Sequence, residues 1–213
     1  MTALLIGSTG ATGKDLLQVL INDKDVLRIE VFARRELNIQ NNKINLHIID
    51  FDKPEEWKHL VKGDVLFSCL GTTLKAAGSK AEQKKVDYQY QYQFAKTARE
   101  NGVESLVLVS SDYASAKSPV FYSRIKGELE EDVKMLNFPK LIIFNPPILI
   151  RKGSDRKAEV LSVKIISILN SLGLFRSFRP LPTELLAKAM VNSFKRLNDG
   201  AYSVKGRKIY EFL

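Results

Sequence analysis

The stretch ALLIGSTGATGKD, residues 3–15, places a glycine-rich turn directly after an apolar run. Two kinds of nucleotide-binding loop begin in this way, and Gly13 followed by Lys14 would fit the phosphate loop of a nucleotide hydrolase. That loop also requires a glycine five positions before Gly13 and a hydroxyl residue after the lysine. Ser8 and Asp15 stand at these positions instead. The sequence therefore excludes the hydrolase loop at this turn.

The glycines instead fall at positions 7, 10 and 13, between a strand-like run and an amphipathic, helix-like segment. In such a turn the first glycine permits a tight bend, the second lets the backbone approach a pyrophosphate, and the third allows close helix packing. The positive N-terminus of the helix then attracts the phosphates. We expect a dinucleotide to bind along this turn, at Gly7, Ser8, Thr9, Gly10, Ala11, Thr12 and Gly13.

Alternating apolar runs and amphipathic segments predict the fold. Runs such as 106–109 and 141–144 are apolar on both faces, which is typical of strands buried between two helical layers. The pattern predicts an α/β fold with a doubly wound, Rossmann-type parallel sheet, in a single domain that spans residues 1–213. We expect strands at residues 2–6, 28–33, 44–49, 64–68, 105–110 and 141–145.

One segment has an ambiguous period. Residues 86–94, VDYQYQYQF, alternate as a half-buried strand does, yet Val86, Tyr90 and Phe94 also share one helical face. The amphipathic pattern continues to a typical helix stop at 101–102. Because a parallel sheet needs a crossover connection before its next strand, we predict a helix here.

The last third of the chain changes character. An apolar helix is expected at 158–172, a second helix at 183–197 and a short strand near 207–212. We interpret residues 148–182 as a small C-terminal helical cap over the sheet. Because such caps commonly shape substrate pockets, we expect this one on the substrate side.

The chain is basic, with 33 Lys and Arg against 24 Asp and Glu and a formal net charge of +9. Such a charge invites a nucleic-acid interpretation. However, the basic residues are dispersed in isolated pairs, without a basic arm, a recognition-helix motif or metal-ligand spacing. We therefore expect neither nucleic acid nor a metal ion as a ligand.

The cellular compartment is inferred from cysteine usage and from the N-terminus. Cys69 is the single cysteine, so it cannot form an internal disulfide, which suits a reducing environment. No charged and then apolar segment resembles a secretory signal, and no apolar run approaches the ~20 residues of a membrane span. We expect a cytoplasmic protein without a membrane span.

The end of the second expected strand should distinguish the two nicotinamide cofactors. An acidic residue there binds the ribose 2′-hydroxyl of NAD, whereas arginine pairs with the 2′-phosphate of NADP. The sequence has Arg34 and Arg35 at this point and no acid at positions 33–35. It therefore favours NADP, with NADPH as the reduced form, over NAD.

The three-residue spacing of the glycines resembles the short-chain dehydrogenase/reductase superfamily, especially its extended and atypical branches. The resemblance implies that the ends of later strands complete the cofactor site. Contacts are then expected beside the adenine ring, at the nicotinamide ribose and at the carboxamide, from Asp50, Phe51, Leu70, Gly71, Thr72, Pro146 and Ile148.

In that superfamily a Tyr-x-x-x-Lys pair on a helix carries the proton chemistry, with a serine at the end of the preceding strand. Residues four apart share a helical face, so the lysine ammonium can favour the phenolate. Only one candidate follows a serine-ended strand and a loop and then lies on a helix. The three candidates in this chain are Tyr92/Lys96, Tyr113/Lys117 and Tyr122/Lys126, and the last fits this order.

Carried over to this chain, Tyr122 would be the general acid in reduction. Lys126 would tune its pKa and bind the cofactor ribose, and Ser111 or Ser110 would donate a hydrogen bond to the substrate carbonyl. The short interval from Ser111 to Tyr122, with CLGTT at 69–73 and FNPP at 144–147, resembles a narrower group. These are the atypical NAD(P)H-binding proteins related to the Tat-interacting oxidoreductase-like protein.

The resemblance implies two alternative functions. The first is an NADPH-dependent oxidoreductase that reduces a carbonyl or conjugated double bond of a small-molecule substrate. The second is a catalytically weak NADP(H)-binding protein that senses redox state and acts through a protein partner. Many catalytic members have an asparagine that anchors a relay water where this chain has Asp87. This difference keeps the regulatory interpretation open.

Overall fold

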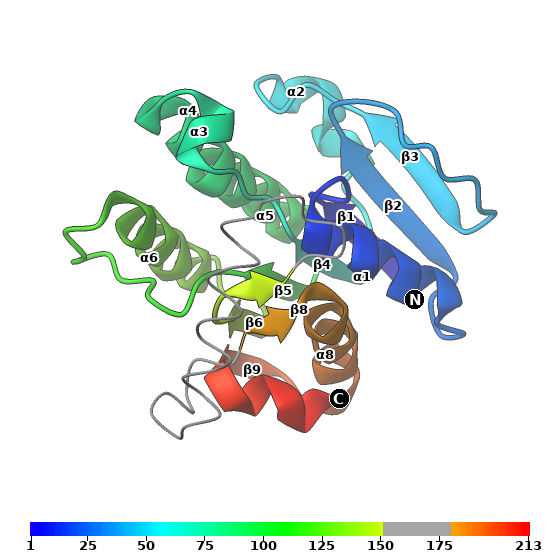
Figure 1. The fold of residues 1–213 in the computed structure, drawn as a ribbon. Coiled ribbons are helices and arrows are strands. Elements are labelled where there is room, and N and C mark those ends of the chain that lie inside the picture. Colours follow the sequence, from blue (N-terminus) through cyan, green and yellow to red (C-terminus); the bar gives the residue numbers. More distant parts are fainter. Residues whose placement is uncertain (151–179) are drawn as a thin grey trace.

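The computed structural model describes residues 1–150 and 180–213. Its centre is a parallel sheet of seven strands in the order β3-β2-β1-β4-β5-β6-β9, with helices on both faces (Figure 1). A separate pair joins β7 (Leu149–Ile150) to β8 (Leu181–Pro182). The strands of the large sheet are β1 (Thr2–Ile6), β2 (Arg28–Ala33), β3 (Ile44–Ile48), β4 (Val65–Ser68), β5 (Ser105–Val109), β6 (Lys140–Asn145) and β9 (Gly200–Lys205).

The strand order reverses beside β1. From β1 the chain adds β2 and then β3 on one side, and it then crosses to β4 on the other side of β1. The loops after β1 and β4 therefore diverge to opposite faces of the sheet. A crevice at the carboxyl ends of the strands at such a reversal is the usual ligand site of doubly wound sheets.

Two apolar cores cover the two faces of the sheet. Alternate residues of β1 serve different cores: Leu5 packs toward helices α1 (Ala11–Asn22) and α8 (Thr183–Arg196), whereas Leu4 packs toward α5 (Tyr90–Glu100) and α6 (Phe121–Met135). Short helical segments complete the layers. They are α2 (Pro54–Trp57), η1 (Lys58–Leu60), α3 (Leu74–Ala77), α4 (Lys80–Lys84), η2 (Lys85–Gln89) and η3 (Gly206–Phe212).

The six strands expected from the sequence are confirmed, with ends that differ by one residue at most. The expected doubly wound parallel sheet is confirmed as well. Because both faces of the sheet are covered by helices, its inner strands are continuous apolar runs, and such runs are easy to recognise in a sequence.

The ambiguous tyrosine-rich segment is helical, as predicted, and contains a turn of π-helix at η2. Its alternation arises because both sides of the helix contact other elements. Tyr88 stacks with Tyr92 and donates a hydrogen bond of 2.5 Å to Asp132 of α6. Tyr90 instead stacks on Phe51 across the loop that follows β3. Because aromatic residues pack on both sides of this helix, they occur two positions apart as well as four.

In the last third of the chain, one predicted element differs from the structure. The prediction of a strand near 207–212 is wrong, because the strand is β9 at Gly200–Lys205 and the following residues form η3. Gly206, with a φ of +52°, ends the strand there. The helix expected at 183–197 is confirmed as α8. The helix expected at 158–172 and most of the expected cap at 148–182 lie outside the described residues.

Helix α6 packs closely against the loop that precedes it. A Cβ atom at Gly127 would lie 2.1 Å from the backbone nitrogen of Ala116 and 2.1 Å from the carbonyl carbon of Ser115. Real Cβ contacts are never this short, so only glycine fits between α6 and this loop at their present separation.

We predict that Gly127→Ala lowers the free energy of unfolding by about 1–3 kcal/mol, because the added methyl group must push backbone away. Denaturant unfolding measures this change. Glu131→Ala, at an exposed position of the same helix, is the control and should leave stability nearly unchanged. Equal stability of the two variants would contradict the close packing of α6.

Candidate functional site

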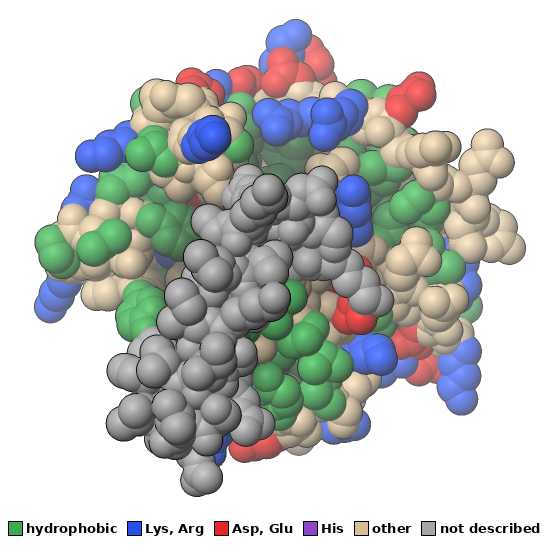
Figure 2. Space-filling model, viewed as in Figure 1, with side chains coloured by type: hydrophobic (Ala, Val, Ile, Leu, Met, Phe, Trp, Pro, Cys, Tyr) green, Lys and Arg blue, Asp and Glu red, His purple; other side chains and the backbone are tan. Residues whose placement is uncertain are grey.

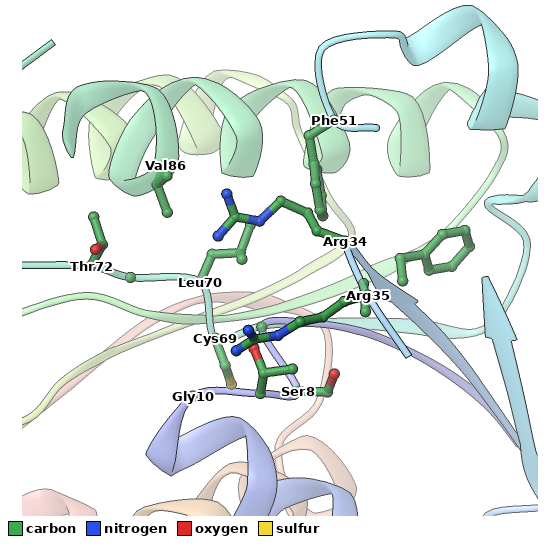
Figure 3. Close-up of a pocket in the computed structure, with 14 residues that line it drawn as sticks. Ser8, Gly10, Arg34, Arg35, Phe51, Cys69, Leu70, Thr72 and Val86 are labelled. Atoms are coloured by element: carbon green, nitrogen blue, oxygen red, sulfur yellow. The ribbon is translucent and has the colours of Figure 1, made fainter. Parts of the chain in front are cut away.

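A cleft of about 410 Å³ opens at the carboxyl ends of β1, β2 and β4, where the strand order reverses (Figure 3). It lies where doubly wound sheets bind their ligands. Its walls come from the glycine turn, the ends of β2 and β4, and η2. The lining residues are Gly7, Ser8, Thr9, Gly10, Phe32, Ala33, Arg34, Arg35, Phe51, Cys69, Leu70, Gly71, Thr72 and Val86.

The glycine turn is pressed against the end of β4. Gly7 has a φ of +86°, and a Cβ there would lie 2.4 Å from the carbonyl carbon of Cys69. A Cβ at Gly13 would lie 2.0 Å from the carbonyl oxygen of Gly7. Gly7 therefore requires glycine because of its backbone angle and its contacts. Gly13 requires it because α1 packs closely against the turn.

The N-terminus of α1 presents free backbone donors to the cleft. Gly10 is its N-cap and supplies no side-chain hydrogen bond, and the first turn contains no acidic residue. Unpaired N–H groups and the helix dipole favour an anion at this point. Ala11, Thr12 and Gly13 form this first turn, behind the residues that line the cleft.

Ser8 gives independent support for a polar ligand. Its side chain is only 2% exposed, and its hydroxyl has no hydrogen-bond partner among the described residues. A buried hydroxyl without a partner costs about 1–3 kcal/mol. A phosphate oxygen of a dinucleotide would accept a hydrogen bond from it, so the turn fits this class of ligand.

Arg34 and Arg35 extend from the end of β2 into the cleft (Figure 3). Both side chains are exposed, and neither has an ion-pair partner within residues 1–150 and 180–213. On the face shown in Figure 2, Lys and Arg side chains are spread over several elements, and one group lies between α4 and β3, where β2 ends. The two arginines therefore provide unpaired positive charge at the cleft.

The far wall of the cleft is aromatic and apolar. Phe51 lies there with its ring stacked on Tyr90 at a centroid distance of 5.2 Å, and Val86 lines the same side. Asp50 does not line the cleft. Its carboxylate accepts a hydrogen bond from the backbone of Asp52, and its carbonyl oxygen accepts one from the Trp57 indole. Asp50 thus stabilises the turn that presents Phe51.

Sequence reasoning missed four residues of the cleft. Phe32 and Ala33 end β2 immediately before the arginines, and Cys69 precedes the predicted Leu70. These three could have been found as neighbours of predicted contacts. Val86 gave no such signal, because only the packing of η2 over the sheet brings it to the cleft.

Lys126 connects the helix of the predicted proton donor to the cleft wall. Its side chain is 2% exposed, and its Nζ lies 3.4 Å from Oδ1 of Asp87 and 3.5 Å from the carbonyl oxygen of Val109. The other carboxylate oxygen of Asp87 accepts a 3.0 Å hydrogen bond from the backbone of Thr72. Lys126, Asp87 and Thr72 therefore form one chain of contacts from α6 to the loop after β4.

The Asp87 carboxylate is completely buried at this point. Burial raises its pKa, while the Lys126 ammonium opposes that shift. Apart from its ion pair with Lys126, the Oδ1 atom of Asp87 has no hydrogen-bond partner among the described residues. The nearby thiol of Cys69 is also affected, since burial raises its pKa to about 12. This thiol stays protonated near neutral pH and is a poor nucleophile.

The other predicted catalytic side chains lie near α6 but do not line the cleft. Tyr122 is 38% exposed at the start of α6. The Ser110 hydroxyl is buried and donates a hydrogen bond to Glu130. The Ser111 side chain is half-buried, and its hydroxyl makes no hydrogen bond in the described part of the chain. Ser111 is therefore the serine whose hydroxyl is available to a ligand.

Two further predicted contacts follow β6. Pro146 is buried, and its carbonyl oxygen accepts a 3.2 Å hydrogen bond from the backbone of Asp112. Ile148 is 47% exposed and bonds through its carbonyl oxygen to Leu181. The predicted residues thus form two groups, one around the cleft and one around the ends of β5 and β6.

Within 1–150 and 180–213, no group of three or more His, Cys, Asp and Glu side chains could hold a metal ion. No helix in these ranges is both long enough and apolar enough to cross a bilayer.

Comparisons of sequence identify relatives of the chain. A family model described as NAD(P)H-binding matches residues 7–134, from the first glycine of the turn to the end of α6. Protein FMP52, mitochondrial, of Meyerozyma guilliermondii is 37% identical over 198 residues, which cover 90% of this chain and 84% of that protein. Protein HTATIP2 of Rattus norvegicus is 30% identical and covers 90% of this chain and 80% of its own length.

Comparisons of structure give the same fold. UDP-glucose 4-epimerase of Thermotoga maritima superposes with a TM-score of 0.72 at 11% identity, covering 96% of this chain and 76% of the epimerase. MoeE5, solved with UDP-glucose and NAD, gives a TM-score of 0.71 at 13% identity, covering 96% and 75%. At these identities the likeness shows the fold alone.

The relatives overturn one expectation. The predicted cytoplasmic location is contradicted, because FMP52 proteins from several fungi are named mitochondrial. The expectation rested partly on the single Cys69, and a free thiol is compatible with any reducing compartment. Cysteine usage therefore could not choose among such compartments.

The family match begins at Gly7, where close backbone contacts require glycine, and it extends past Lys126. It covers more than half of the chain, and the relatives cover most of it. The chain belongs to the NAD(P)H-binding family, as an atypical short-chain dehydrogenase/reductase related to HTATIP2 and FMP52.

Proposed function

We propose that the protein is an NADPH-dependent oxidoreductase that reduces a carbonyl or conjugated double bond of a small molecule. The observation that carries the proposal is the contact chain from the arginine-bearing cleft through Thr72 and Asp87 to Lys126. It links a dinucleotide cleft to the helix that bears a tyrosine and a lysine four residues apart. When bound, NADPH would supply the hydride.

The cleft supports binding of the adenine half of NADPH. Ser8 and the start of α1 would hold the pyrophosphate, and Phe51 would contact the adenine ring. Arg34 and Arg35 would pair with the 2′-phosphate, because both are exposed at the rim without an acidic partner in the described residues. The lining contains no carboxylate that would repel this phosphate.

The second group of residues supports proton transfer. Tyr122 would donate its phenolic proton to the substrate oxygen, and Ser111 would donate a hydrogen bond to the same atom. The buried ammonium of Lys126 would stabilise the phenolate that remains. Ser110 is less suited to this task, because its hydroxyl already bonds to Glu130.

The buried ion pair favours a second candidate function. Asp87 holds Lys126 from within the protein, whereas an asparagine at this position would leave its ammonium without a charged partner. A lysine neutralised in this way stabilises a tyrosine phenolate less effectively. The alternative is therefore a catalytically weak NADP(H)-binding protein that responds to the redox state of the cofactor and acts through a protein partner.

We predict that Tyr122→Phe lowers the rate of NADPH oxidation about 10²–10⁴-fold and leaves NADPH affinity unchanged, because only the transferable proton is lost. A panel of aldehydes, ketones and quinones, monitored by NADPH absorbance, measures the rate. Tyr113→Phe is the matched control, since Tyr113 also precedes a lysine by four residues but lies in an exposed loop. If no substrate in the panel is turned over and a partner binds in one redox state only, the alternative function holds.

We also predict that Arg34→Ala and Arg35→Ala each weaken NADPH binding about 10- to 100-fold, because each removes a charge-assisted hydrogen bond worth about 1.5–3 kcal/mol. NADH lacks the 2′-phosphate, so its affinity should not fall. Calorimetric titration with both cofactors measures the difference, and Lys24→Ala, at an exposed position after α1, is the control. Equal losses for NADPH and NADH would show that the arginines do not recognise the phosphate.

A further inference from the structure

Glu130 is a buried carboxylate to which neither the cleft nor the proposed proton transfer assigns a role. It lies on α6, four residues after Lys126 and eight after Tyr122, so the three side chains share one face of the helix. The residue is only 8% exposed. Its Oε1 atom accepts hydrogen bonds from the Ser110 hydroxyl and, at 2.6 Å, from Nδ2 of Asn145.

The network continues through Asn145 to two more segments. Asn145 is completely buried at the end of β6, and its Nδ2 also donates to the carbonyl oxygen of Ser111 at 3.0 Å. Its Oδ1 accepts a 2.9 Å hydrogen bond from the Ser203 hydroxyl on β9. Glu130 and Asn145 together therefore join α6 to the carboxyl ends of β5, β6 and β9.

Backbone hydrogen bonds join the ends of β5 and β6. The Ser110 N–H donates to the carbonyl oxygen of Phe144 at 2.8 Å, and the Asp112 N–H donates to that of Pro146 at 3.2 Å. The loops that carry Ser111 and Pro146 are thus tied to each other. Through Ser110 and Asn145, Glu130 ties both of them to the helix of Tyr122 and Lys126.

Burying the carboxylate of Glu130 costs folding free energy, so a purely structural role does not explain why this position is acidic. Desolvation of a charge is costly, and a well-packed apolar residue often stabilises such a position at least as well. One oxygen of Glu130 accepts two hydrogen bonds, and these bonds fix the orientation of both donor groups. An apolar residue at this position could not orient the donors. The arrangement therefore orients Ser110 and Asn145, at a cost in folding stability.

We propose that Glu130 is a positioning residue, which holds the Ser111 and Pro146 loops against the face of α6 that carries Tyr122 and Lys126. The proposal rests on the proposed function, because these loops are those expected to meet the nicotinamide half of NADPH. Glu130 touches neither the cleft around Arg34 nor the glycine turn. Its loss therefore affects the nicotinamide half of the cofactor and leaves the adenine half in place.

Calorimetric titration with two probes tests this division. NADPH reports on both halves of the site, and adenosine 2′,5′-bisphosphate reports on the adenine half alone. Glu130→Ala should weaken NADPH binding about tenfold and leave the affinity for the bisphosphate unchanged, because Ser110 and Asn145 lose their acceptor. Glu130→Gln should restore most of the NADPH affinity, since its amide oxygen can accept both hydrogen bonds. Glu131→Ala, at the next and exposed position, is the matched control and should bind both probes as the wild type does.

Other outcomes overturn the proposal in distinguishable ways. Equal loss of affinity for both probes in Glu130→Ala would show a general structural role, and unchanged NADPH affinity would show no role. Should Glu130→Ala fail to fold, Ser110→Ala removes a single donor of the network and should produce the same selective loss to a smaller degree. A wild-type protein that binds the bisphosphate but gains nothing from the nicotinamide half would overturn the proposed function itself, and this inference with it.

Discussion

The close contact between the glycine turn and the end of β4 is the constraint on which the site depends. No side chain fits at Gly7, because a Cβ would lie 2.4 Å from the Cys69 backbone. This contact holds the N-terminus of α1 at the point where the strand order reverses, so its free N–H groups face the cleft. The third glycine, Gly13, lets α1 approach the turn behind it. A larger residue at either position would move the anion site away from the sheet.

A second set of contacts joins the cleft to the elements that carry the proposed catalytic residues. The buried pair of Lys126 and Asp87 reaches the loop after β4, and Glu130 with Asn145 ties α6 to the ends of β5 and β6. Both carboxylates lie in low-dielectric surroundings, where a charge requires defined partners. The two buried acids therefore fix α6 relative to the sheet from two sides. Such fixed geometry is what transfer of a proton or a hydride requires.

Much of the fold could be predicted, for a physical reason. Strands buried on both faces are uninterrupted apolar runs, so their positions followed from the sequence to within a residue. The prediction of a strand near 207–212 was wrong because β9 has only one strongly buried residue, Val204, and so lacks an apolar run. Hydrogen bonding to β6 stabilises β9 as a strand instead. The cleft residues near the glycines and arginines were also predictable, because they adjoin a recognisable motif. Val86 was not, because it reaches the cleft only through packing of η2.

By itself the sequence determined the glycine turn, the pair of arginines and the order of serine, tyrosine and lysine, since these depend on residue type and spacing along one chain. Only the tertiary structure decided which groups meet. Asp50 turns out to stabilise a loop, the Ser110 hydroxyl is committed to Glu130, and Asp87 holds Lys126. These outcomes depend on contacts between residues far apart in sequence, whose geometry is set by how two helical layers pack on one sheet. Spacing along the chain carries no record of that packing.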